Sequence, residues 1–249
     1  MKYITRNKRR WKAGCLSRTT KAGKSRFRVY GTDGTPPVID RSLWDSIKDP
    51  IDPSLVWHII NQANQGSCCA AAGCGIMMLI REIAGLKQVV LSQASLYGQG
   101  NGGRDSGMAI DTCLDILMDV GACPVDLIDQ YDWQGFRKGT WPDNWKEIAK
   151  RFRGLEAWDC PTLDHVVSAN KLGFPVLYGA KGHAVVRIGR NLDINSWDYS
   201  WGDNGLGQWV SEKVLASEIR GYGAWALRFA IDPIDDGDLP QPKRVAKTT

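Results

Sequence analysis

The stretch from Gln62 to Cys74 constrains the fold more than any other part of the chain. It starts as a polar loop and runs straight into an apolar segment. From Cys68 through Ile80 there is no charged residue and no proline, so we predict a helix that protein surrounds on every side. Gly85 fits the C-terminal cap of this helix.

Cys68 would occupy the first turn of the predicted helix. Unpaired backbone N–H groups and the positive end of the helix dipole favour a thiolate there, and the thiolate is the nucleophilic form of cysteine. Cys68 is therefore a candidate catalyst, provided that a base and an orienting group lie elsewhere in the chain.

The bulk properties describe a chain of 249 residues that can bury a sizeable core. No segment approaches the roughly 18 uncharged apolar residues of a membrane span, and no signal peptide is recognisable. We therefore expect a soluble, unsecreted protein that is cytoplasmic or virion-associated.

The cysteine content argues against a disulfide framework, because the number is odd and three cysteines cluster within seven positions. There is no Cys-x-x-Cys pair, so we expect no zinc site and no other metal or cofactor. Most of the cysteines should pack as small apolar residues. They are Cys15, Cys68, Cys69, Cys74, Cys113, Cys123 and Cys160.

Charge is distributed unevenly along the chain. Residues 1–31 hold eleven Lys or Arg and no acid, whereas the rest carries 21 basic and 27 acidic residues, a net charge of −6. Trp11, Phe27 and Tyr30 lie among these bases, a pattern suited to following a nucleic-acid backbone and stacking on its bases. The alternatives are a solvated arm, an arm that docks on an acidic protein, and a removable pro-segment, which its shortness argues against.

A glycine-rich stretch from Gly98 to Gly107 is predicted to be a loop. It lacks the strand-loop-helix context and the Gly-Lys-Ser/Thr ending of a phosphate-binding loop, so we expect it to expose backbone to a ligand or to be flexible. After it, apolar residues from Ile110 to Leu117 recur at helical spacing, and Gly121 should end that helix.

The second half of the chain is richer in predicted strands than the first half. Residues 163–172 are predicted as a short helix, and residues 174–179, 184–189, 209–215 and 224–231 as strands. Helices first and strands second predict an α+β protein with two lobes. The expected divisions are a basic tail (1–31), a helical lobe with the nucleophile (32–125), a β-rich lobe (126–232) and a C-terminal surface tail (233–249).

Two groups in the β-rich half complete a pattern. His183 starts an apolar strand, and Asn195 opens an Asn-Ser-Trp sequence that leads to Trp-Gly-x-Asn-Gly at Trp201. Each alone has a plain structural explanation, a core histidine or a turn. Together with Gln62 six positions before Cys68 in Gly-Ser-Cys, they resemble papain-like cysteine peptidases in three places and in family order. The resemblance covers about residues 36–232 and implies a papain-like fold with an antiparallel, barrel-like second lobe and an active site in the cleft between the lobes.

The resemblance implies a role for each matching residue. Cys68 corresponds to the nucleophile, His183 to the general base and acid, and Asn195 to the residue that orients the imidazole. Gln62 corresponds to the side chain of the oxyanion hole. The residues expected on the substrate side of the site are Gly107, Ala184, Trp197 and Trp201, of which Trp197 matches the indole that covers the Asn–His contact.

Neighbouring residues compete for some of these roles. Placing Gln65 in the oxyanion hole would move the nucleophile position to Ala71, so the register favours Gln62. Cys69 takes a place that is usually aromatic and is a rival nucleophile. Gly102 and Gly103 are alternatives to Gly107 if the loop has an insertion.

We interpret the chain as a thiol hydrolase, a cysteine peptidase that acts on polypeptides through an acyl-enzyme. The chain departs from the family pattern in three ways: it lacks the cysteines of the secretory disulfides, a long pro-region and a polar residue at position 182. The resemblance therefore does not identify the substrate or the mode of regulation. The alternative is a papain-like structural or binding module of a nucleoprotein particle such as a virion, anchored by its basic tail. A third possibility is the same chemistry on a non-peptide amide.

Overall fold

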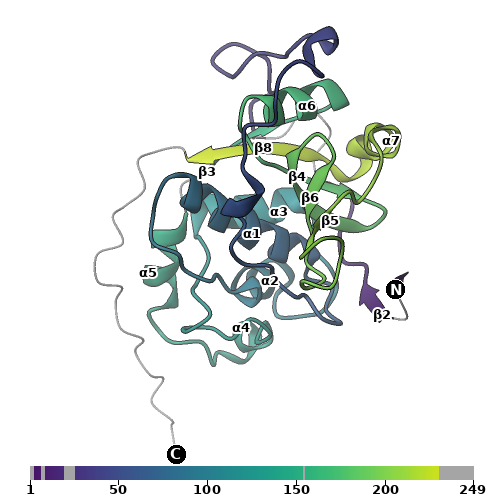
Figure 1. The fold of residues 1–249 in the computed structure, drawn as a ribbon. Helices are drawn as coiled ribbons and strands as arrows, with labels where there is room; N and C mark the ends of the chain where they lie inside the picture. The colour runs from purple at the N-terminus through teal and green to yellow at the C-terminus, as the bar shows by residue number, and fades with distance from the viewer. Residues whose placement is uncertain (1–2, 7–8, 20–25, 154, 230–249) are drawn as a thin grey trace, which may run out of the picture.

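The structure is a computed structural model that describes residues 3–6, 9–19, 26–153 and 155–229 (Figure 1). Helices dominate the first half of the described chain and strands the second. The helices are α1 (Cys68–Ile83), α2 (Gln93–Asn101), α3 (Ile110–Asp119), α4 (Gly135–Lys138), α5 (Trp145–Ala149), α6 (Leu163–Lys171) and α7 (Glu212–Tyr222). The short 3-10 helices are η1 (Arg41–Leu43), η2 (Pro53–Leu55) and η3 (Lys150–Phe152). The strands are β1 (Tyr3–Arg6), β2 (Arg9–Lys12), β3 (Leu155–Asp159), β4 (Val176–Ala180), β5 (His183–Gly189), β6 (Leu192–Ile194), β7 (Leu206–Gly207) and β8 (Ala224–Phe229).

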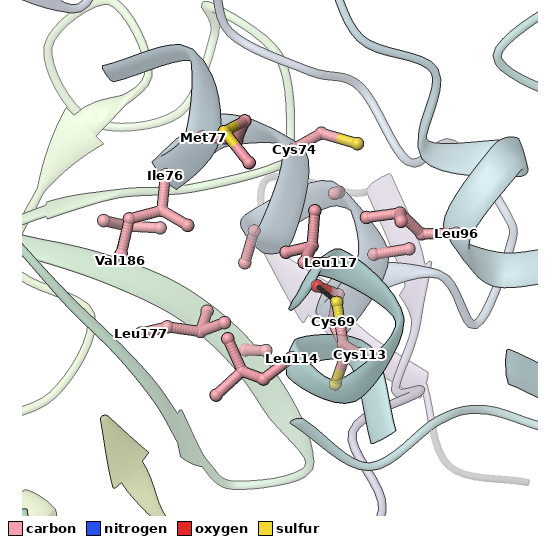
Figure 2. Close-up of a cluster of buried hydrophobic side chains, with 14 of the residues drawn as sticks. Cys69, Cys74, Ile76, Met77, Leu96, Cys113, Leu114, Leu117, Leu177 and Val186 are labelled. Carbon is pink, nitrogen blue, oxygen red and sulfur yellow. Dashed lines mark hydrogen bonds between the residues drawn. The ribbon is translucent and has the colours of Figure 1, made fainter. Parts of the chain in front are cut away.

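Helix α1 is the predicted buried helix, and it lies between the helices α2 and α3 on one side and strand β5 on the other. Gly85 follows its C-terminus with φ of +70°, the conformation expected of the predicted cap. Figure 2 shows Ile76 of α1 beside Val186 of β5, and Cys69 beside Cys113 of α3. A Cβ on Gly73 would lie 2.6 Å from the Cys113 sulfur, so this glycine permits α3 to approach.

The sheet has six strands in the order β3-β8-β4-β5-β6-β7, and every neighbouring pair is antiparallel. The edge strands β3 and β7 do not pair with each other, so the sheet is open. The α+β prediction is thus confirmed, whereas the barrel-like form was wrong. Closure requires the two edges to meet, and β7 has only two residues with which to extend the sheet.

Two segments differ from the predicted elements. The glycine-rich stretch was predicted to be a loop, but its first residues belong to α2. Gly98 and Gly100 allow neighbouring residues to pack closely against this helix, since a Cβ on Gly98 would lie 2.7 Å from the Trp133 carbonyl oxygen. Residues 209–215 are not a strand, since α7 starts at Glu212. Leu215 and Ile219, four residues apart, form the buried face of that helix.

The basic N-terminal region is not a free tail where the structure describes it. Strands β1 and β2 form an antiparallel hairpin, and residues 12–19, here called the N-terminal arm, pack against the body of the protein. The predicted C-terminal tail, residues 233–249, lies outside the described residues. Among the described helices, none combines the length and apolarity that crossing a membrane requires.

Candidate active site

Cys68 is the first residue of α1, as predicted, and its side chain is completely buried. Ser67 is the N-cap residue, but its hydroxyl donates to Gln93 Oε1 at 2.9 Å and so does not cap the helix. The N–H groups of the first turn therefore have no side-chain cap from Ser67. This position favours negative charge on the thiol.

A tight turn places His183 at the start of β5. Lys181 and Gly182 connect β4 to β5 with φ values of +53° and +75°, and Ala180 pairs directly with His183 across the hairpin. Two residues with positive φ match the twist of an antiparallel pair, so a two-residue connection suffices. The glycine before the histidine is thus required by the turn, which explains why no polar residue stands there.

Asn195 follows β6 and meets the imidazole of His183. Its Oδ1 lies 2.7 Å from His183 Nε2, and the same oxygen accepts from the backbone N–H of Ser196 at 2.7 Å. Trp197 stacks on the histidine ring with centroids 4.5 Å apart and planes 26° apart. Trp209 meets the same ring edge-on at 5.4 Å. The imidazole is therefore fixed in orientation and shielded from water.

The thiol of Cys68 contacts the imidazole of His183 from the opposite side. Asn195 engages Nε2, and Nδ1 is buried with no hydrogen-bond partner recorded within the described residues, so Nδ1 is the ring nitrogen left for the thiol. Burial raises the pKa of the Cys68 thiol, but hydrogen bonds from Cys69 and His183 and the charge of the imidazole outweigh it, so the pKa falls well below its usual 9.0. The Cys68 thiol is therefore easier to ionise than the thiol of Cys69 or Cys74.

Cys69 differs from its neighbour although it is equally buried. Its Sγ lies 3.0 Å from the carbonyl oxygen of Met108, and burial together with the adjacent Cys15 and Cys68 raises the pKa of its thiol well above 9.0. Burial likewise raises the pKa of Cys74 well above 9.0. These two cysteines behave as packing residues, as the register of the sequence indicated.

Gln62 rather than Gln65 directs its amide into the site. The Oε1 of Gln62 accepts from Ser196 Oγ at 2.7 Å, which orients its Nε2 as a donor. That Nε2 donates to the carbonyl oxygen of Gln65 at 2.9 Å and to the carbonyl oxygen of Lys12 at 3.2 Å. Gln65 thus supplies only its backbone to this arrangement.

The N-terminal arm occupies the space in front of these residues. The backbone N–H of Cys15 donates to the Gly182 carbonyl oxygen at 3.0 Å. Met108 accepts from the Leu16 N–H at 3.1 Å and donates to the Gly14 carbonyl oxygen at 2.9 Å. A polypeptide can therefore lie in extended form between the loop before α3 and the turn before β5, bonded by its backbone.

The predicted substrate-side residues lie around this arm to different degrees. A Cβ on Gly107 would lie 2.7 Å from the Gly14 carbonyl oxygen, so this glycine does admit a polypeptide, although Met108 makes the bonds. Ala184 is buried on β5 next to His183, and its backbone N–H bonds to the Cys68 sulfur. Trp197 covers His183 as described, and Trp201 packs edge-on against Trp197 with ring centroids 6.4 Å apart, so its place on the substrate side stays a prediction.

Acidic side chains of the body hold the basic N-terminal region. The buried pair between Arg18 and Asp159 has an N–O distance of 2.9 Å, and Thr19 donates through its N–H and hydroxyl to Asp111 at 2.7 and 2.6 Å. Bases with intramolecular partners are not free for phosphates, so the structure gives the expected nucleic-acid partner no support. Within the described residues, the ion pairs of this region are Lys12–Asp105, Arg18–Asp159, Arg26–Asp115, Arg26–Asp119 and Arg28–Glu156.

Several residues of the site were missed by the sequence analysis. Ser196 was read only as part of the Asn-Ser-Trp motif, yet it orients Gln62. Asp105 receives the side chain of Lys12, and the sequence offered one signal for it, an isolated acid within a glycine-rich stretch. Trp209 was assigned to a strand. Their roles depend on contacts across the fold, which spacing alone does not reveal.

Comparisons with known proteins bear on the fold. No family model and no curated sequence matches the chain. Among solved structures, it is similar to xylellain, a cysteine protease from Xylella fastidiosa, with a TM-score of 0.68 and 17% identity over 88% of this chain and 97% of that one. The proform of the ragweed pollen cysteine protease Amb a 11 matches with a TM-score of 0.59 and 16% identity over 82% and 71%.

A third similar structure is procathepsin L 3 from the larval midgut of Tenebrio molitor. Its TM-score is 0.56 and its identity 14%, over 85% of this chain and 75% of that chain. At such low identity, what the proteins share is the arrangement of helices and strands. The chain therefore has the papain-like fold of these cysteine proteases.

Proposed function

We propose that this protein is a cysteine peptidase that cleaves polypeptides through an acyl-enzyme on Cys68. The proposal rests on the arrangement of Cys68, His183 and Asn195. The His183 imidazole hydrogen bonds to the Cys68 thiol, and its Nε2 lies 2.7 Å from Asn195 Oδ1. Such an arrangement supplies a nucleophile, a proton carrier and an orienting group in the required order. The papain-like fold supports the same conclusion.

In the proposed reaction, the Cys68 thiolate attacks the carbonyl carbon of a peptide bond and forms a C–S bond. The carbonyl oxygen takes up the electron pair and is stabilised by Gln62 Nε2 and the Cys68 backbone N–H. The His183 imidazolium gives its proton to the departing amine as the C–N bond breaks. Water, deprotonated by His183, then attacks the thioester, which releases the acid and restores the thiol.

The structure describes a latent arrangement of this proposed enzyme. The N-terminal arm bonds to Gly182, Met108 and Gln62, the groups that a substrate backbone would use. A substrate must therefore displace the arm before it reaches Cys68. We infer that removal or release of the arm precedes full activity.

Labelling with an electrophilic thiol probe tests the proposal on the full-length chain. Cys68 is expected to react first, because its thiol alone has a depressed pKa among the neighbouring cysteines. Cys68→Ala should abolish both labelling and peptide hydrolysis. Cys74→Ala should retain them and serves as the matched control, since it removes a buried thiol from the same helix that is not among the groups lowering the Cys68 pKa.

Two results would contradict the assignment. Undiminished labelling of Cys68→Ala would show that another cysteine is the reactive one. Hydrolysis of non-peptide amides but of no polypeptide, in a screen of both, would keep the mechanism and replace the substrate class.

A further inference from the structure

Asp105 forms a fixed acidic site beside the proposed catalytic residues. Its Oδ1 accepts from the Gly66 N–H at 2.9 Å and from the Tyr97 hydroxyl at 2.7 Å. The Tyr97 oxygen in turn accepts from the Gly107 N–H at 2.9 Å. These bonds leave Oδ2 for the ammonium group of Lys12, which donates to it.

The Lys12 side chain is enclosed by this site. Only 9% of it is exposed, and its Nζ donates to the Asp105 carbonyl oxygen at 2.9 Å as well as to the carboxylate. Burial of Asp105 alone would raise the pKa of its carboxyl group, but the bonds from Lys12, Gly66 and Tyr97 hold that pKa below its usual value. The site is therefore a preformed receptor for a positive charge.

The position of Lys12 relates this receptor to the reaction. Its carbonyl oxygen accepts from Gln62 Nε2 at 3.2 Å, and Gln62 is the proposed oxyanion donor. Lys12 thus accepts a hydrogen bond from Gln62 through its carbonyl oxygen and binds Asp105 through its side chain. A substrate residue whose carbonyl takes that position has the Asp105 carboxylate within reach of a long basic side chain.

We propose that Asp105 is a specificity-determining residue that selects Lys or Arg at the residue whose carbonyl is attacked. This inference rests on the proposed function, since it assigns the substrate preference of the same site. The N-terminal arm uses the receptor as a substrate would, with Lys12 as the internal occupant. A neutral side chain of equal length would leave the carboxylate without its charged partner.

Competition between two peptides in one reaction tests the inference on the full-length chain. The peptides differ only at the residue before the cleaved bond, which is Lys in one and norleucine in the other. The ratio of their kcat/KM values does not depend on the fraction of molecules whose arm is released, because both peptides compete for the same open sites. We expect a ratio of roughly 10 to 100 in favour of Lys.

Asp105→Asn is the informative variant. Its amide oxygen can still accept from Gly66 and Tyr97, so the loop is retained while the negative charge is lost. The ratio should fall to about 3 or less. Asp119→Asn is the matched control, because Asp119 also pairs with the basic region, but through Arg26 rather than Lys12 and with its side chain 61% exposed. Its ratio should equal that of the wild type.

A ratio near one in the wild type, or an unchanged ratio in Asp105→Asn, would overturn the inference. If the full-length chain hydrolyses neither peptide, binding decides the inference separately from the proposed function. The two peptides then compete for Cys68→Ala, where a preference for Lys that Asp105→Asn removes supports the receptor. Equal binding of both peptides to Cys68→Ala would refute it.

Discussion

Two buried polar clusters share strands β5 and β6, and their construction differs. At one end of the pair, Arg187 and Asp193 form a doubly bonded ion pair with N–O distances of 2.8 and 3.0 Å, and neither side chain is exposed. Tyr178 and the Trp209 backbone add two more donors to the same carboxylate. Both carboxylate oxygens of Asp193 are therefore occupied.

At the other end, His183 and Asn195 leave one reactive pair of atoms. Asn195 orients the ring, whereas Nδ1 has no hydrogen-bond partner recorded within the described residues and is left for the Cys68 thiol in the proposed reaction. The contrast teaches that burial of polar groups does not by itself indicate function. The distinguishing feature is a proton that can lie on either of two atoms, which a closed ion pair does not offer.

The largest expected effect comes from removing the histidine. His183→Ala should lower kcat/KM by roughly 10³- to 10⁴-fold, because the thiolate loses its partner and the leaving amine its proton donor. The protein should remain folded at the assay temperature, although loss of the buried ring that stacks on Trp197 lowers the thermal midpoint. Peptide hydrolysis and thermal unfolding measure the two effects, and a loss of activity matched by unfolding would contradict the comparison.

The ion pair should respond in the opposite way. Asp193→Ala should lower the free energy of unfolding by about 3–5 kcal/mol, because a buried guanidinium loses its counter-charge. Denaturant titration measures this effect. The double variant Arg187→Met with Asp193→Leu is the control, since removing both charges should restore much of the stability.

Gln62→Ala should reduce kcat by about 10²- to 10³-fold, the usual cost of one oxyanion donor, with a smaller change in KM. Gln65→Ala is the matched control, because Gln65 contributes its carbonyl oxygen and not its side chain to the arrangement. Steady-state kinetics separate the two variants. An equal loss in both would remove the oxyanion role from Gln62.

The smallest effect is a shift along the pH axis. The Cys68 pKa lies well below 9.0, so the thiolate persists as pH falls through neutrality and is lost only when pH passes the depressed value. Labelling rates of the wild type should therefore stay high at pH values where an ordinary cysteine is protonated. In His183→Ala the labelling profile should move toward alkaline pH, and an unmoved profile would show that the imidazole does not lower the thiol's pKa.

The sequence predicted the elements that local patterns determine. Helix α1, the strand that begins at His183 and the approach of Asn195 followed from apolar runs and motif order. The open edge at β7 and the helical start at Glu212 did not, because strand pairing and the burial of Leu215 depend on distant segments. The cytoplasmic or virion location and the role of residues 233–249 stay predictions.

The N-terminal arm shows most clearly what sequence reasoning lacked. A run of bases among aromatic residues suggested an external partner, whereas Lys12 and Arg18 bind Asp105 and Asp159 of the same chain, 93 and 141 positions away. Nothing in the local spacing of charges identifies carboxylates so distant. The net charge of −6 beyond residue 31 was the available signal, and it was read only as composition.

Because the arm is part of the chain, its hold on the cleft does not weaken on dilution. A tethered segment competes at an effective concentration on the order of millimolar, whatever the amount of protein in solution. A free peptide of the same sequence would have to reach that range to match it. Cleavage of the chain between the arm and the body would turn the arm into a separate peptide, which can dissociate and diffuse away.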